Sequence, residues 1–200
     1  MMNIRKININ DADAFWQMLC ELDKETKYMM YEPNERTKDM DQINSLIKKS
    51  VEGINLLLVV ENNKEIVGFL SAERGVPNRI RHTAYIVVGI RKAFQGKGIG
   101  SNFFKELDLW ARQNGIKRLE LTVMCPNTVA KHLYEKNGFV IEGIRKNAMY
   151  VDGEYIDEFF ESVMVMVEDE KVRNNRLALL ASVSRFMASV ADLSLIVPAQ

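Results

Sequence analysis

The sequence predicts an α/β (α+β) fold, in which a mixed, mostly antiparallel central sheet is flanked by helices and a helical tail is appended at the C-terminus. Two strand–turn–helix units follow one another in the second half, and two β-rich runs then flank Asp152-Gly153, a strong hairpin signal. The chain has 200 residues, 47% of them hydrophobic and 27% charged. This length and composition predict one globular domain with an addition rather than two domains.

Strands and helices alternate irregularly in the first half. Ile4, Ile7 and Ile9 indicate a first strand, and Asp11 or Asp13 then caps a helix with apolar residues at helical spacing. A polar stretch separates it from the next helix. The remaining elements expected here are a helix at 37–51, a hairpin formed by the apolar runs 54–60 and 66–72, and a strand at 83–90.

The second half repeats one pattern. The strand at 83–90 runs into a glycine cluster that opens a helix, which ends near Asn114-Gly115. A strand at 119–123 then precedes a helix capped by Asn127 and closed by Asn137-Gly138. The runs 139–150 and 155–167 complete the sheet as a hairpin.

The composition changes after Lys171. From Leu177 to Gln200 the only charged residues are Arg185 and Asp192, and apolar residues recur at helical spacing. We therefore expect a domain at 1–168 and a helical tail at 169–200. The tail is too polar to span a bilayer and too apolar to stay in water as a free helix, so it should dock. It could dock on its own domain or on a second subunit, and the second alternative would give a homodimer.

Charge and cysteine content narrow the function classes. Lys plus Arg and Asp plus Glu both number 27, which argues against a protein whose main task is to bind nucleic acid. Cys20 and Cys125 lie far apart without metal-ligand spacing, so neither a disulfide framework nor a metal site is expected. No apolar leader or membrane span is apparent. We expect a cytoplasmic protein with no membrane partner.

The glycine cluster at residues 95–101 predicts a phosphate-binding turn. A helix that starts at closely spaced glycines presents free N–H groups and the positive end of its dipole to an anion. The nucleotide P-loop is excluded because Gly98 follows Lys97 and Arg stands at 91. The dinucleotide fingerprint fits poorly because Ser101 replaces its third glycine.

A third loop type fits better. Gln95, Gly98 and Gly100 match a Q/R-x-x-G-x-G/A signature, and residues 127–139 match N-x-x-A-x-x-L-Y-x-x-x-G-F. With both motifs, the sequence resembles the GCN5-related N-acetyltransferase (GNAT) family over roughly residues 3–167, in particular its ribosomal-protein and polyamine acetyltransferase subset. The resemblance implies acetyl-CoA as co-substrate and no metal.

The resemblance also implies which residues contact that cofactor. The glycine turn would wrap its pyrophosphate, and the pantetheine arm would pair with the backbone of the preceding strand, where a glycine permits close approach. Asn127 would bind the pantetheine amide, cap its helix, or do both. The cofactor-binding residues expected are Val88, Gly89, Ile90, Gln95, Gly96, Lys97, Gly98, Ile99, Gly100, Ser101, Asn127 and Tyr134.

Tyr134 is the expected catalytic residue. It lies on the helical face of Asn127, and the family uses the matching tyrosine as the general acid that protonates the leaving thiolate. The alternative is a helical tyrosine bonded to backbone. The general base stays unassigned among Glu120, Glu73 and His82, because Tyr85 stands where many relatives carry an acid. His82 and His132 suit surface or structural roles better.

The predicted function is transfer of an acetyl group from acetyl-CoA to a primary amine of a small molecule or protein N-terminus by direct attack. The segment 28–33 resembles an acceptor-side loop whose carboxylate could attract a cationic amine. The alternative from another class is a non-catalytic acyl-CoA-binding module, which retention of Tyr134 disfavours. A dinucleotide-dependent oxidoreductase is disfavoured by the glycine spacing.

Overall fold

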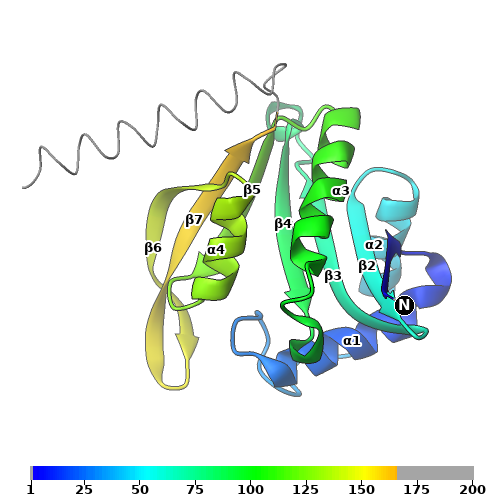
Figure 1. The fold of residues 1–200 in the computed structure, drawn as a ribbon, viewed down its shortest axis with the longest axis horizontal. Coiled ribbons are helices and arrows are strands. Elements are labelled where there is room, and N and C mark those ends of the chain that lie inside the picture. Colours follow the sequence, from blue (N-terminus) through cyan, green and yellow to red (C-terminus); the bar gives the residue numbers. More distant parts are fainter. Residues whose placement is uncertain (1, 166–200) are drawn as a thin grey trace, which may run out of the picture. The chain divides into compact units, whose positions relative to one another are not determined.

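The computed structural model describes residues 2–165. Within them one sheet has the strand order β1-β2-β3-β4-β5-β7-β6 (Figure 1). Neighbouring strands are antiparallel except β4 and β5, which run parallel. The predicted mixed, mostly antiparallel sheet is therefore confirmed. The predicted tail helix and the boundary at 168 lie outside the described residues.

The elements follow the expected order with small shifts at their ends. The strands are β1 (Met2–Lys6), β2 (Leu56–Asn62), β3 (Glu65–Arg74), β4 (Thr83–Ile90), β5 (Arg118–Met124), β6 (Val140–Val151) and β7 (Glu154–Met164). The helices are α1 (Ala12–Glu25), α2 (Met40–Val51), α3 (Ile99–Gln113) and α4 (Thr128–Lys136).

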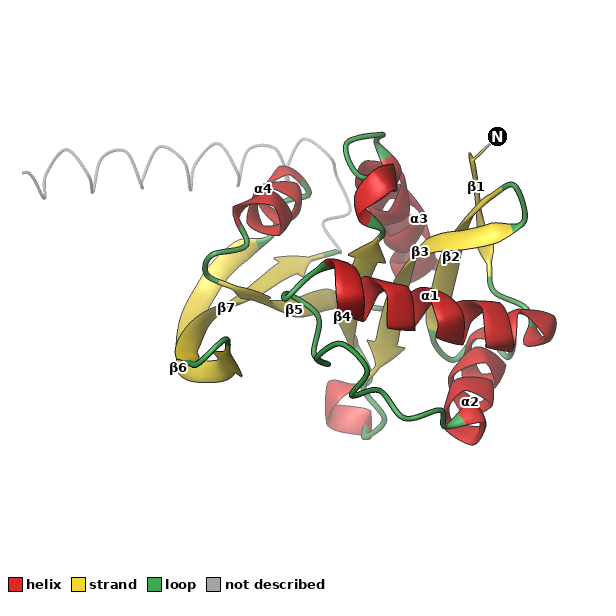
Figure 2. Ribbon diagram, turned by 90° about the horizontal axis from the view of Figure 1, so that it is seen from below, coloured by secondary structure: helices red, strands yellow, loops and turns green. Residues whose placement is uncertain are grey.

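Helices cover both faces of the sheet. Figure 2 shows α3 and α4 on one face and α1 and α2 on the other. Successive side chains of a strand point to opposite faces, so Leu56 and Leu58 pack in the α3/α4 core whereas Leu57 and Val59 pack in the α1/α2 core. Double coverage explains why β2 is an unbroken apolar run and not an alternating one.

The start of α1 differs from the prediction. The first strand ends at Lys6, and Ile9 lies instead in a short 3-10 turn. Asn8 accepts a hydrogen bond from the backbone of Asn10, and Asp11 accepts one from the backbone N–H of Asn8. Asp11 stands at the N-cap of α1, as expected, but its side chain makes no capping hydrogen bond to that helix: its carboxylate closes the preceding turn and binds Arg5 at 2.7 Å.

The β6–β7 hairpin turns at the predicted dipeptide. Asp152 and Gly153 have φ values of 53° and 87°, and the strands pair directly on both sides of them, Val151 with Glu154. Two consecutive positive φ angles are the geometry that an Asp-Gly hairpin favours.

The sheet opens at its centre. Strands β4 and β5 pair only over 83–85 and 118–120, after which β4 continues beside β3 to Ile90 and β5 beside β7 to Met124. Along the rest of their length, the facing edges of these two strands have no ladder partner among the described residues. This opening between α3, α4 and the loop after α1 creates the cavity described next.

Candidate active site

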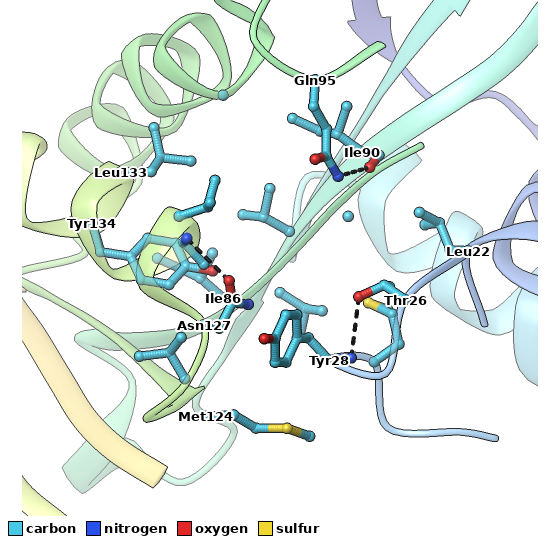
Figure 3. Close-up of a pocket in the computed structure, with 18 of the residues that line it drawn as sticks. Leu22, Thr26, Tyr28, Ile86, Ile90, Gln95, Met124, Asn127, Leu133 and Tyr134 are labelled. Carbon is cyan, nitrogen blue, oxygen red and sulfur yellow. Dashed lines mark hydrogen bonds between the residues drawn. The ribbon is translucent and has the colours of Figure 1, made fainter. Parts of the chain in front are cut away.

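The opening between β4 and β5 leads into a cavity of about 720 Å³. Figure 3 shows Gln95 and Ile90 at one end of it and Met124 and Tyr28 at the other. We call the first the glycine end, because residues 95, 96 and 98–101 line it, and the second the methionine end. The methionine end contains Tyr28 and Met124, and Glu158 belongs to it because it pairs with Met124 across the sheet; Met29, Met30 and Met149 also line the cavity.

The glycine end presents unused backbone donors. Within the described residues, no hydrogen bond uses a backbone N–H of residues 96–101. Gly96 and Gly98 have φ values of 72° and 78°, and a Cβ at either would meet no atom within 4 Å. These glycines are therefore required by backbone conformation, and the space beside them is open. The arrangement suits an anion with several oxygens at the start of α3.

Hydrogen bonds from the end of β4 and from the end of α1 hold the glycine turn in place. The Gln95 side chain donates to the carbonyl of Ile90 at 2.9 Å, so it braces the turn against the end of β4. Glu25, at the end of α1, accepts from the backbone N–H of Lys92 at 2.6 Å and from Arg91 at 3.0 Å. Lys97 does not line the cavity and instead lies 4.9 Å from the ring of Phe94.

Two predicted glycines meet protein atoms rather than open space. A Cβ on Gly100 would lie 2.7 Å from Leu133, so this glycine permits the close packing of α3 on α4. A Cβ on Gly89 would lie 2.7 Å from both Leu22 and Phe69. The missing side chain of Gly89 thus makes room for α1 and β3, although the residue also lines the cavity with Val88 and Ile90.

Asn127, at the N-cap of α4, and Tyr134, within α4, both line the cavity (Figure 3). Asn127 accepts a hydrogen bond from the backbone N–H of Ala130 at 3.2 Å, so it caps α4, and its amide N–H groups have no partner among the described residues. Tyr134 is only 8% exposed and packs edge-on against Phe104. Its hydroxyl makes no hydrogen bond to any described residue, so the backbone-bonded alternative is not what the structure shows.

Burial controls the acidity of Tyr134. Loss of solvent raises the pKa of its phenol well above the ordinary value, and the nearby Glu161 and Tyr85 raise it further. The group is therefore protonated at neutral pH, as a proton donor must be. Tyr85 lies at the last paired position of β4 and shares a hydrogen bond of 2.8 Å with Thr122 of β5, where the strands separate.

The methionine end contains a carboxylate that the sequence argument missed. Glu158 of β7 lines the cavity, is 6% exposed, and is bound to Arg145 of β6 at 3.0 Å. It pairs with Met124, the last residue of β5, on the part of β5 that no longer pairs with β4. The sequence around Glu158, which follows Asp157 in a hairpin strand, does not distinguish it from a surface carboxylate. Only the pairing of β7 with β5 shows that it lines the cavity.

None of the three predicted base candidates lines the cavity. Glu120 is bound to Arg118 at 2.6 Å, while Glu73 and His82 lie outside the lining. Part of the predicted acceptor loop, 28–33, lies at the cavity. Tyr28, Met29 and Met30 line it, but Glu32 does not. Arg36 holds this loop by binding Asp23 at 2.7 Å and stacking on the ring of Tyr31.

Among residues 2–165, no group of three or more His, Cys, Asp or Glu side chains is placed to hold a metal ion. None of the helices in that part of the chain is long and apolar enough to cross a membrane.

A sheet that opens between two parallel strands, with free N–H groups at a helix start and a protonated tyrosine farther along the same cavity, defines a site for an extended phosphate-bearing cofactor. The model of the Acetyltransferase (GNAT) family matches residues 16–139. The chain therefore belongs to the GNAT acetyltransferase family, as its motifs predict.

Solved structures share the fold. An acetyltransferase of the GNAT family from Streptococcus pneumoniae is 27% identical and superposes with a TM-score of 0.78 over 83% of this chain and all (100%) of that one. YncA from Salmonella typhimurium, solved with acetyl-CoA, is 22% identical with a TM-score of 0.74 over 84% of this chain and 95% of that one.

Curated relatives are matched over shorter stretches. The L-amino acid N-acetyltransferase AaaT of Escherichia coli K12 is 31% identical over 100 residues, which is 48% of this chain and 60% of the relative. The glycine–tRNA ligase beta subunit of Geobacter sp. strain M21 is 58% identical over 43 residues, 22% of this chain. The chain spans only 6% of that subunit's length.

Proposed function

We propose that this chain is an N-acetyltransferase that passes the acetyl group of acetyl-CoA to a primary amine of a small molecule or a protein N-terminus by direct attack. The observation that carries the proposal is the row of unpartnered N–H groups at residues 96–101, which opens into the cavity that also contains Tyr134. The binding of acetyl-CoA by YncA, which has the same fold, supports the choice of cofactor.

In this proposal the residues of the glycine end bind the pyrophosphate. Backbone N–H groups of residues 96–101 and the positive end of the α3 dipole stabilise its charge. The open edge of β4 at Val88 and Ile90 pairs with the pantetheine amides, although the Ile90 carbonyl already accepts from Gln95. The unpartnered amide N–H groups of Asn127 supply a further contact.

Tyr134 stabilises the leaving sulfur. Attack of the amine on the thioester breaks the carbon–sulfur bond and leaves a thiolate, whose conjugate acid has a pKa near 8.5 if it behaves like an ordinary thiol. Because burial raises the pKa of Tyr134, its hydroxyl is protonated when the thiolate forms and can donate a proton to the sulfur. The Tyr134 hydroxyl is available for this, since it makes no hydrogen bond to a described residue.

The alternative is a non-catalytic acyl-CoA-binding module. Both readings predict acetyl-CoA binding, so calorimetry with acetyl-CoA tests the cofactor and a thiol-release assay over a panel of primary amines tests the reaction. Tight binding with thiol release above the hydrolysis rate supports the acetyltransferase. Binding without release for every amine would establish the binding module, and absence of binding would overturn both.

We also propose that the protein works in the cytoplasm and forms a homodimer. Cys20 and Cys125 are free thiols, which suits a reducing compartment. The dimer proposal rests on the apolar periodicity at 177–191. Light scattering on the whole chain and on a chain ending at Lys171 tests it: the proposal requires that the truncation converts a dimer to a monomer while acetyl-CoA binding survives.

A further inference from the structure

We propose that Glu158 is the carboxylate that binds the acceptor amine and takes its proton, and that the acceptor is a primary amine attached to an apolar group. This inference rests on the proposed function and adds to it a base and a substrate class. It starts from the contents of the methionine end.

Glu158 differs from the other carboxylate in contact with the cavity. Within the described residues, Glu25 and Glu158 are the only acidic residues in the lining. Both oxygens of Glu25 are occupied, one by Arg91 and the other by the backbone of Lys92. Glu158 uses one oxygen, Oε2, for Arg145 at 3.0 Å, and its Oε1 has no hydrogen-bond partner among the described residues. It is therefore the carboxylate with capacity for an ammonium group.

The position of Glu158 along the sheet suits that role. Glu158 pairs with Met124, two residues beyond Thr122, whose hydroxyl bonds Tyr85 where β4 and β5 separate. Two residues of strand span about 7 Å. An amine nitrogen needs about 3 Å to a carboxylate oxygen and about 3 Å to the carbon that it attacks. An amine held by Glu158 thus reaches a carbonyl placed at the opening, beside Tyr85.

The surroundings of Glu158 specify the rest of the acceptor. Met29, Met30, Met124 and Met149 come from the loop after α1, from β5 and from β6; all four line the cavity, and Met124 lies directly opposite Glu158. Thioether side chains adapt to apolar groups of different shape and offer only a weak sulfur acceptor to a second ammonium. With one partly neutralised carboxylate, this end suits a monoamine with an aliphatic or aromatic body better than a polyamine.

The acceptor nitrogen loses two protons during the transfer, one to Glu158 and one to Tyr134. The ammonium gives one proton to Glu158, and the free lone pair then forms the nitrogen–carbon bond as the carbon–sulfur bond breaks. The sulfur takes the hydroxyl proton of Tyr134, and the second proton released by the new amide nitrogen restores that hydroxyl. Glu158 returns its proton to solvent through the open end of the cavity. No further reactant is required.

Kinetics of Glu158→Gln test the proposal, with 2-phenylethylamine and spermidine as acceptors. At pH 7 we expect kcat/KM for 2-phenylethylamine to fall by about 10²-fold or more, with unchanged acetyl-CoA affinity. The loss should shrink as the pH approaches the pKa of the amine, near 10, because free amine then needs no base. The wild-type protein should prefer 2-phenylethylamine to spermidine by more than about tenfold, the effect of a single misplaced polar group.

Glu120→Gln is the matched control. Glu120 lies on the neighbouring strand, is also paired with an arginine, and does not line the cavity, so its loss should leave kcat/KM unchanged. If Glu158→Gln does not fold, Glu158→Asp replaces it, because the shorter carboxylate should also lower kcat/KM at pH 7. A folded Glu158 variant with wild-type kcat/KM, a loss that persists at pH 10, or a preference for spermidine overturns the inference while the acetyltransferase stands. Absence of turnover by the wild type with every amine overturns the proposed function instead.

Discussion

Replacing Glu161 by methionine should stabilise the protein. Glu161 of β7 is 0% exposed, and neither of its carboxylate oxygens has a hydrogen-bond partner within residues 2–165. It stands opposite Leu121 of β5 and faces the α3/α4 core. Burying such a group without a partner costs about 1–3 kcal/mol. For a chain of this size each kcal/mol shifts Tm by about 2–4 °C, so a gain of about 2 kcal/mol raises Tm by about 4–8 °C.

The gain should depend on pH. Burial raises the pKa of Glu161, the charge of Glu135 raises it further, and Lys131 opposes them. An acid with a raised folded-state pKa contributes its full stability below the unfolded value, near 4.3, and loses it as the pH rises through the folded value, at about 1.4 kcal/mol per pH unit. The Tm difference between Glu161→Met and wild type should therefore be smallest near pH 4 and larger at pH 8.

Thermal unfolding followed by circular dichroism at pH 4, 6 and 8 measures both effects. Glu161→Gln is the control: it removes the charge but keeps a buried polar group, so it should remove the pH dependence and give less stability than methionine. A methionine variant that melts below wild type at pH 8, or a Tm difference that is the same at pH 4 and pH 8, would refute the reasoning.

Three further predictions concern other residues. Tyr134→Phe should lower kcat by about 10²-fold with little change in acetyl-CoA affinity, because only donation to the leaving sulfur is lost; equal kcat where chemistry limits would assign Tyr134 a packing role. Gly98→Ala and Gly115→Ala should each cost about 1–2 kcal/mol of stability, because both positions have positive φ and open space beside them. Only Gly98→Ala should weaken acetyl-CoA binding in calorimetry, by about tenfold, and equal affinities would remove the 96–101 turn from the binding site. Glu142, whose pKa the Arg118 guanidinium and then Ser162 lower to about 2, stabilises the fold above the unfolded pKa near 4.3. At pH 7 the Glu142→Gln variant should therefore unfold at a lower urea concentration than the wild type, and its free energy of unfolding should be lower by under about 1 kcal/mol because the ion pair is partly exposed. The difference should disappear as the pH falls through about 2, and a difference that is constant across pH would contradict this.

The sequence predicts local structure well where one residue type determines the geometry. Asp152-Gly153 needs two positive φ angles, and the helix at Ile99 needs a turn that Gly96 and Gly98 allow. Asn127 caps α4 as its spacing indicates. Each of these depends on neighbours a few residues away, which a sequence displays directly.

Features that depend on strand register were not predictable in this way. The opening between β4 and β5 is a property of the pairing of distant strands, and the stretch 86–90 looks like any other buried strand. Glu158 and Glu161 are three residues apart in one strand, and their periodicity alone does not say that one lines the cavity and the other lies in the core. Likewise, Gly89 suggests room for a ligand until Leu22 and Phe69 are seen to fill that space.

The short contact between β4 and β5 has a mechanical consequence. Within residues 2–165 only three ladder pairs, 83–85 with 118–120, join the β1–β4 half of the sheet to the β5–β7 half, together with hydrogen bonds at His82 and between Tyr85 and Thr122. Amide hydrogens at this seam should therefore exchange with solvent sooner than those in the β2–β3 ladder, which continues over the full length of β2. A ligand seated in the opening would act as a missing strand between the halves. Its binding should slow exchange on both sides of the seam together, including at residues that it never touches.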